Sequence, residues 1–361
     1  MNERLTFSHC VIEVIVNKST TIDYVKDYME EKRGTHYFLR AVVLNDVPSV
    51  KTLIDSMPID VRDDSGSTPL MIAAGNKNAL ELTRLLLAKF DAKFLHAKHG
   101  NALMAAVSDG NVEGVKLLMP VSDLFAKDGD GRTALMHAAR YGHEKIVSML
   151  LPLSDALEKD NKGENALMHA ARGKHVECVD KLKKSSSLTD KNSRGETALH
   201  VAVYAQSVGC AAALLATKKG AECAKMHLDP NPPLHIAIIN GWTEMAALLA
   251  PFSDSSVKTK NGQTAWNLLS REATRDEHIE IAEILAPFSS AHPIREWLEL
   301  FARPIHARIF PKCLAVLEAE EIRAEIEKAS MRGKTPIGKE AEVGEPGSKI
   351  KPVLSNRVGR L

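Results

Sequence analysis

The sequence has few aromatic residues, almost no net charge and no long apolar run. Phe, Trp and Tyr make up 5% of its 361 residues, and the formal net charge is +1. A charge this small gives no reason to expect bulk attraction to nucleic acid or to an anionic membrane surface. No stretch approaches the roughly 18 apolar residues that a membrane helix requires. The apolar run Val11–Val16 is short and contains Glu13, so it makes a poor signal peptide. We therefore expect a cytoplasmic protein without nucleic-acid binding or membrane insertion.

Sequence motifs of catalysis and metal binding are also missing. The chain has no G-x-x-x-x-G-K-[ST] or G-x-G-x-x-G for phosphate binding, no H-R-D or D-F-G of kinases, and no C-x-x-C. The turn sequence 128–131 resembles the start of a calcium loop, but the twelfth position is Ala139, where that loop needs Glu. His143-Glu144 is followed by Val147, where a zinc-protease motif needs His. We predict no enzymatic activity, no cofactor and no metal, and we interpret the histidines as structural.

One pattern recurs along most of the chain. Its clearest copy, Gly131–Pro152, contains two short helical patterns separated by Gly142, which suits a tight turn because glycine takes positive φ without steric cost. Helices shorter than about 12–15 residues are marginal alone in water, so this unit needs neighbours. A fixed period of about 32 residues is typical of a solenoid. The in-phase pairs are Pro69-Leu70, Ala102-Leu103, Ala134-Leu135, Ala166-Leu167, Ala198-Leu199, Pro233-Leu234 and Ala265-Trp266.

The units resemble ankyrin repeats, whose motif is T-P-L-H-x-A. Gly142-His143 matches the usual Gly-His between the two helices, and the turns 128–131 and 160–163 match the β-turn. Several loops read Pro-x-Ser-Asp, a variant that resembles ankyrin-only proteins expanded in some single-celled eukaryotes. The resemblance implies an all-α fold: an ankyrin-repeat solenoid of about eight helix-turn-helix units with a C-terminal helical extension. The copies of the motif are Thr68–Ala73, Thr133–Ala138, Thr197–Ala202 and Pro232–Ala237.

Composition divides the chain into four expected parts. Residues 1–34 form an N-terminal segment whose helical pattern could cap the first repeat or serve as a docking motif. The repeats occupy residues 35–290, with Gly220–Asp229 as the longest interruption. Residues 291–331 form C-terminal helices that either cap the last repeat or bind a partner. Residues 332–361 have the composition of a disordered tail.

Cysteine and methionine positions are interpreted as packing. Cys178 and Cys210 occupy equivalent places in adjacent repeats, where stacked helices lie about 8–10 Å apart, too far for a disulfide. We expect them to be buried and slow to react, with Cys10 or Cys313 labelled first by thiol reagents. The equally spaced Met71, Met104, Met136 and Met168 are interpreted as core.

The predicted function is that of a non-enzymatic protein–protein interaction scaffold, which binds its partner on the concave ankyrin groove. Binding residues are expected where repeats are free to differ, at the β-turn tips and the exposed end of the first helix. Arg and Tyr are enriched at interface hot spots. The five basic residues in this set predict a mixed basic strip that suits an acidic or aromatic partner. The candidate partner-binding residues are Asp130, Arg132, Arg140, Tyr141, Lys162, Glu164, Arg172, Arg194, Glu196 and Tyr204.

An alternative function stays open at this point. The repeats could select a client for an enzyme complex that docks on the C-terminal helix, in which case the protein is an adaptor or regulatory subunit. Both functions imply a protein partner of unknown identity. We expect a monomer in either case.

Overall fold

The computed structural model describes residues 34–94, 96, 98–225, 231–272, 276–290, 293–294, 312–313, 315–320 and 324. The predicted N-terminal cap, the predicted C-terminal tail and most of the predicted C-terminal helices lie outside these residues. The chain forms two compact units, Met1–Cys223 and Ala224–Leu361. Each unit is considered by itself.

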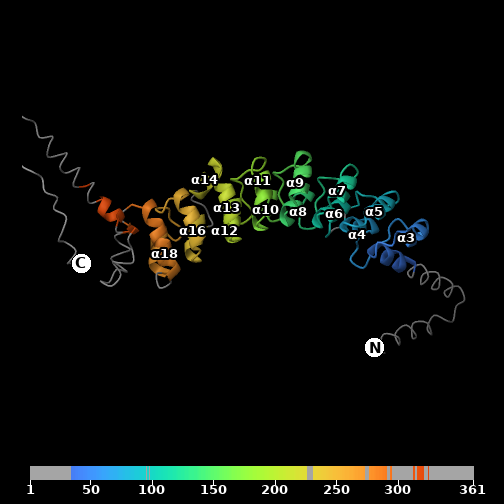
Figure 1. Cartoon of the computed structure of the whole chain (residues 1–361), viewed down its shortest axis with the longest axis horizontal. Helices are drawn as coiled ribbons and strands as arrows, with labels where there is room; N and C mark the ends of the chain where they lie inside the picture. The colour runs from blue at the N-terminus through green and yellow to red at the C-terminus, as the bar shows by residue number, and fades with distance from the viewer. Residues whose placement is uncertain are drawn as a thin grey trace, which may run out of the picture. The chain divides into compact units, whose positions relative to one another are not determined.

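Helix pairs build the first unit. In chain order, the pairs are a helix at 34–43 with α3 (Val47–Leu53), α4 (Pro69–Gly75) with α5 (Leu80–Leu87), α6 (Ala102–Ser108) with α7 (Val112–Leu118), α8 (Ala134–Tyr141) with α9 (Glu144–Leu150), α10 (Ala166–Arg172) with α11 (Val176–Leu182), and α12 (Ala198–Tyr204) with α13 (Val208–Leu215). The first helices of the second to sixth pairs lie side by side in chain order (Figure 1); they are α4, α6, α8, α10 and α12. We number the repeats by these pairs, so that α8 and α9 form the fourth repeat.

The second unit contains two more pairs. They are α15 (Pro233–Ile239) with α16 (Thr243–Leu249), and α17 (Ala265–Glu272) with α18 (Asp276–Leu285). Short 3₁₀ helices follow several second helices: η1 (Ile54–Ser56), η2 (Leu151–Leu153), η3 (Ala250–Phe252) and η4 (Ala286–Phe288). The last three correspond to loops with proline at their second position, where proline suits the start of a helical turn. Among the described residues there is no strand, and the isolated bridge between His96 and Gly100 is the nearest approach to one.

A repeated N-cap fixes where the first helices begin. The side-chain oxygen of the residue before each helix accepts the backbone N–H of the methionine three residues later, which satisfies a donor that the helix itself leaves free. Each methionine is buried, so its interpretation as core is confirmed. The cap–methionine pairs are Thr68 with Met71 at 3.1 Å, Asn101 with Met104 at 3.0 Å, Thr133 with Met136 at 3.4 Å and Asn165 with Met168 at 3.0 Å.

A second repeated contact joins neighbouring repeats. In the third, fourth and fifth repeats, the residue before the second helix donates to one of the last carbonyl oxygens of the preceding repeat's first helix. Asn111 Nδ2 donates to Ala74 at 2.9 Å, and His143 and His175 donate through Nε2 to Ser108 at 3.1 Å and Arg140 at 3.0 Å. Gly142, at φ +76°, makes the turn that places His143, as predicted. His143 and His175 are therefore structural.

Two segments between or after the repeats contain further structure. Lys218–Ala224 forms the helix α14, which overlaps the predicted interruption and lies outside the helix pairs. Cys313, predicted as one of two candidates to react first with thiol reagents, is fully buried, with its Sγ 3.8 Å from the carbonyl oxygen of Ala282. Burial also raises the pKa of this thiol, as it raises those of Cys178, to about 11, and Cys210. Cys10 lies outside the described residues.

No helix in the described part of the chain is long and apolar enough to cross a membrane.

Candidate protein-binding face

The β-turn tips and the exposed ends of the first helices form one face of the first unit, which we call the turn-and-helix face. Its turns are tied together from repeat to repeat. The backbone N–H of Asn161 donates to the carbonyl of Asp130 at 3.0 Å, and the N–H of Ser193 donates to that of Lys162 at 2.9 Å. Gly131, at φ +80°, permits this approach, since a Cβ there would lie 2.8 Å from the Asn161 nitrogen. The turn tips are therefore held in register.

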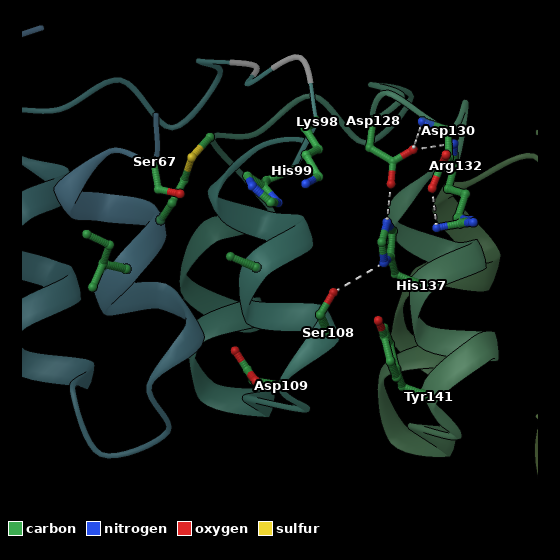
Figure 2. A pocket seen from close by; sticks show the side chains of 13 residues that line it. Ser67, Lys98, His99, Ser108, Asp109, Asp128, Asp130, Arg132, His137 and Tyr141 are labelled. Carbon is green, nitrogen blue, oxygen red and sulfur yellow. Dashed lines mark hydrogen bonds and ion pairs between the residues drawn. The ribbon is translucent and has the colours of Figure 1, made fainter. Parts of the chain in front are cut away.

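A cavity of about 420 Å³ opens on this face at the third repeat. Small side chains leave the space, because Ala105 and Ser108 of α6 stand where α8 carries His137 and Arg140. Tyr141, at the end of α8, closes one side (Figure 2). The residues that line the cavity are Ser67, Met71, Ile72, Lys98, His99, Ala105, Ser108, Asp109, Asp128, Asp130, Arg132, His137 and Tyr141.

A chain of hydrogen bonds runs along one wall of the cavity. His137 Nε2 lies 2.8 Å from Asp128 Oδ2, and His137 Nδ1 lies 3.2 Å from the hydroxyl of Ser108 (Figure 2). Burial alone would raise the pKa of Asp128, but hydrogen bonds from His137 and from the backbone N–H groups of Arg132 and Asp130 outweigh burial and lower it. Asp128 is therefore ionised at neutral pH. The geometry fits a tautomer in which Nε2 donates to Asp128 and Nδ1 accepts from Ser108.

This serine–histidine–aspartate order resembles that of hydrolase triads, but the surroundings of Ser108 disfavour nucleophilic catalysis. Ser108 is the last residue of α6, and a helix C-terminus presents carbonyl oxygens rather than N–H groups. An oxyanion formed there would be repelled, whereas catalysis needs donors aimed at it. The chain of hydrogen bonds instead fixes the orientation of the His137 ring.

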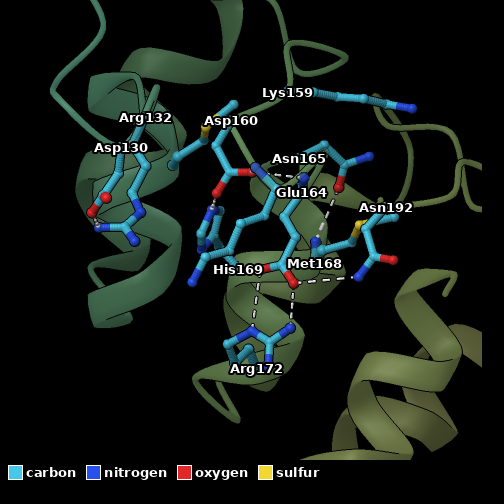
Figure 3. A network of polar contacts seen from close by, with 12 residues as sticks. Asp130, Arg132, Lys159, Asp160, Glu164, Asn165, Met168, His169, Arg172 and Asn192 are labelled. Atoms are coloured by element: carbon cyan, nitrogen blue, oxygen red, sulfur yellow. Dashed lines mark hydrogen bonds and ion pairs between the residues drawn. The ribbon is translucent and has the colours of Figure 1, made fainter. Parts of the chain in front are cut away.

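The fifth repeat carries the same histidine–aspartate pair inside a larger polar network. His169 Nε2 lies 3.0 Å from Asp160 Oδ2 (Figure 3). Beside this pair, the buried carboxylate of Glu164 binds the guanidinium of Arg172 through both of its oxygens. Asn192, from the next repeat, reaches Glu164 at 3.4 Å and Glu196 at 2.8 Å. The network therefore links two consecutive repeats.

Asp160, Glu164 and His169 place possible metal-ligand atoms within 4.8 Å of one another, but their oxygens are already used. Asp160 Oδ1 accepts the backbone N–H groups of Lys162 and Glu164, each at 2.8 Å, while Oδ2 faces His169. Both oxygens of Glu164 bind Arg172, whose positive charge would repel a cation. We conclude that the cluster stabilises the turn and is poorly suited to a metal.

The predicted partner-binding residues divide into exposed and buried groups. The predicted exposure of two acids is wrong, because Glu164 is 3% and Glu196 is 5% exposed, held there by arginine and asparagine partners. Arg132 is half-buried. Whether any of these residues binds a partner stays a prediction. The exposed group comprises Asp130, Arg140, Tyr141, Lys162, Arg172, Arg194 and Tyr204.

The predicted basic strip is mostly neutralised by its own neighbours. Arg132 pairs with Asp130 at 2.7 Å, Arg172 pairs with Glu164, and Arg194 pairs with Glu196 at 2.8 Å. Among the described residues, Arg140 and Lys162 have no ion-pair partner. The Arg140 guanidinium instead lies 5.9 Å from the centre of the Tyr141 ring. The cations that remain available are fewer than the sequence indicates.

The third repeat contributes residues to this face that are not among the predicted ones. Lys98, His99, Ser108 and Asp109 line the cavity together with the predicted Asp130, Arg132 and Tyr141. The period could have found two of them, because Ser108 and Asp109 stand 32 residues before Arg140 and Tyr141. The structure does not bring Lys162 or Tyr204 to the cavity wall.

Comparison with known proteins shows the family. The family model for ankyrin repeats (three copies) matches residues 38–125, 76–160 and 152–227, which together span more than half of the chain. The chain belongs to the ankyrin-repeat family. Its fold is an all-α ankyrin-repeat solenoid, as predicted. Ankyrin repeats are protein–protein interaction modules and are typically non-catalytic.

Among 452 matching chains of solved structures is the ankyrin-repeat domain of human ASB11, with 22% sequence identity and a TM-score of 0.48. The match covers 56% of this chain and 91% of that one. A search of curated proteins gives no significant match.

Proposed function

We propose that the protein is a scaffold that binds a protein partner on the turn-and-helix face, centred on the fourth repeat. The proposal rests on the exposure of Arg140 and Tyr141. Both are exposed at the end of α8, and Tyr141 lines the cavity. Arg140 lies over the Tyr141 ring and has no ion-pair partner among the described residues. Interface hot spots are enriched in arginine and tyrosine.

The charges of this face support a protein partner over nucleic acid. Acidic side chains pair with the cations in three consecutive repeats, as Asp130 does with Arg132, Glu164 with Arg172 and Glu196 with Arg194. A nucleic-acid site would favour a cluster of positive charge that follows the phosphates. A protein partner can match charges of both signs.

Site-specific photo-crosslinking tests the proposal. The full chain would carry a photoreactive phenylalanine analogue at position 141 or, as a control in the same repeat, at position 145. Lys145 is exposed on the second helix α9, away from the first-helix ends. We expect a discrete crosslinked partner from position 141, and weaker or no crosslinking to it from position 145. The reverse pattern would show that the partner binds the second helices.

The adaptor alternative depends on the C-terminal helix. Of this region, Lys312 and Cys313 lie against α18: the backbone N–H of Lys312 donates to Glu283 at 2.9 Å, and Cys313 is buried. These contacts are those of a segment that covers the last repeat. Docking of an enzyme there stays a prediction.

A further inference from the structure

Asp109 occupies an electrostatically unfavourable place. It is the C-cap of α6 and is exposed, and no hydrogen bond or ion pair reaches its carboxylate from the described residues. Helix C-termini carry partial negative charge, so an anion there is repelled. A carboxylate that adds nothing evident to the fold at such a position is a candidate for binding.

A second helix end faces the same carboxylate. A Cβ built on Gly75, the last residue of α4, would lie 2.6 Å from Asp109 Oδ2. The glycine therefore leaves room for the carboxylate against the C-terminal end of α4. The nearby carbonyl of Ala74 is satisfied by the neutral amide of Asn111, which adds no positive charge. The carboxylate thus lies beside the negative ends of two helices.

The cavity holds its Lys98 and Asp109 side chains far apart and is also lined by an aromatic ring. Lys98 and Asp109 lie at opposite ends of the cavity (Figure 2). Tyr141 lines the wall and is 47% exposed. Aromatic faces attract cations, most strongly arginine guanidinium groups. Ile72 and Ala105 supply apolar surface of the kind that covers the methylene stem of a long basic side chain.

We propose that this cavity receives a lysine or arginine side chain of the protein partner, with its cationic head at Asp109. The inference rests on the proposed function and names the chemistry of one contact on the same face. It differs from the expectation drawn from sequence, in which basic residues select an acidic partner. That expectation counted arginines which the structure finds paired with Asp130, Glu164 and Glu196.

A random peptide library displayed on phage and selected against the full chain tests this contact. We expect peptides that carry one essential Lys or Arg. Asp109→Asn should weaken the best peptide about tenfold or more, because it removes a charge-assisted contact. Glu177→Gln makes the same chemical change on the second helix α11 and should leave affinity unchanged. Asp109→Lys should select peptides with Asp or Glu in place of the basic residue.

Thermal melting separates lost binding from lost structure. Asp109→Asn removes an anion from a helix C-terminus, so its melting temperature should equal or exceed that of the wild type. A fall in melting temperature would mean that Asp109 stabilises the fold, and it would contradict the argument.

The possible outcomes distinguish this inference from the proposed function. Peptides that depend on Tyr141 but carry an essential acid, and that are weakened by Lys98→Glu rather than by Asp109→Asn, would overturn the basic-anchor inference alone. Peptides insensitive to both Tyr141→Ala and Arg140→Glu would overturn the proposed function. A selection that enriches no peptide would count against the proposed function, and the inference would fall with it.

Discussion

The fourth and fifth repeats begin their first helices with the same seven residues, Ala-Leu-Met-His-Ala-Ala-Arg, yet present different surfaces. In both, the histidine contacts the aspartate of its own turn. Arg140, at the end of the fourth repeat's copy, has no ion-pair partner among the described residues, whereas Arg172 binds the buried Glu164. The difference arises eight residues upstream, where Arg132 stands in place of glutamate. One turn residue therefore decides whether the helix-end arginine is occupied or available.

The preceding repeat adds to this difference. His137 contacts the hydroxyl of the small Ser108 at 3.2 Å in the cavity wall. The residue 32 positions after Ser108, which precedes His169 in the same register, is the much larger Arg140. Identical first-helix sequences therefore stand beside different residues in the two repeats. Function in this family is decided by such variable positions, since the packing positions are shared.

The core should not distinguish the two repeats. Leu150 and Leu182 are equivalent and both fully buried. Leu150→Ala and Leu182→Ala should each lower the free energy of unfolding by roughly 2–5 kcal/mol. Because stability in a solenoid passes between neighbours, hydrogen exchange should rise mainly in the mutated and flanking repeats. A uniform rise along residues 60–223 would contradict this, and very different costs for the two variants would show that the repeats differ in their cores as well.

Charge reversal of Arg140 and of Arg172 should lower the free energy of unfolding by different amounts. Arg172→Glu places a second carboxylate against buried Glu164 and should lower the free energy of unfolding by about 2–3 kcal/mol. Arg140→Glu removes no ion pair with a described residue, but it places an anion in the last turn of α8, so it should lower the free energy of unfolding by about 1 kcal/mol or less. Urea unfolding of the two variants measures this. Equal costs would mean that the pairing with Glu164 has no energetic weight.

Acid should act on the fifth repeat through His169. Burial lowers the pKa of His169 below its usual 6.5, against the opposing effect of Asp160 and Glu164. In the unfolded chain His169 therefore becomes protonated near pH 6.5, whereas in the folded chain it stays neutral to a lower pH. The free energy of unfolding accordingly falls as the pH drops below about 6.5. Hydrogen exchange of residues 166–172 should increase between pH 7 and pH 5, after correction for intrinsic rates. His169→Gln should reduce the increase, and an unchanged increase would assign the acid effect elsewhere.

The smallest expected effect is a change in the chemical reactivity of Arg140 when Arg132 is substituted. Arg132→Glu gives the fourth repeat the turn residue of the fifth, so Arg140 should become paired as Arg172 is. In the wild type, the arginine reagent phenylglyoxal should modify Arg140 faster than Arg172, as peptide mapping would show. In Arg132→Glu the two rates should approach each other. If Arg140 keeps its high reactivity, a residue other than 132 controls it.

Much of the fold follows from the sequence because it depends on local, repeated chemistry. Gly142 forms the predicted turn, and the motif Thr133–Ala138 begins with the cap of α8, at a position that recurs with the 32-residue period. The C-terminal segment was harder. The burial of Cys313 depends on a contact with Ala282 of α18, about 30 residues away in the sequence, and the repeat pattern does not predict this contact.

The candidate face was only partly predictable, for the same reason. The turn sequence alone predicts that Glu164 is exposed, but its partner Arg172 comes from the helix end and its partner Asn192 from the next repeat. The cavity exists because Ala105 and Ser108 have small side chains. A cavity of this kind corresponds to no sequence motif.

The central claim is that the first-helix side of the fourth repeat binds the partner. The most direct test measures the affinity of the crosslink-identified partner for the full chain carrying either Arg140→Glu or Lys145→Glu. Each variant reverses one exposed cation that has no ion-pair partner among the described residues, Arg140 on α8 and Lys145 on α9. We predict that Arg140→Glu weakens binding about tenfold or more, as expected for a hot-spot residue, while Lys145→Glu leaves it within error of the wild type. Equal loss in both variants, or loss in Lys145→Glu alone, would contradict the account.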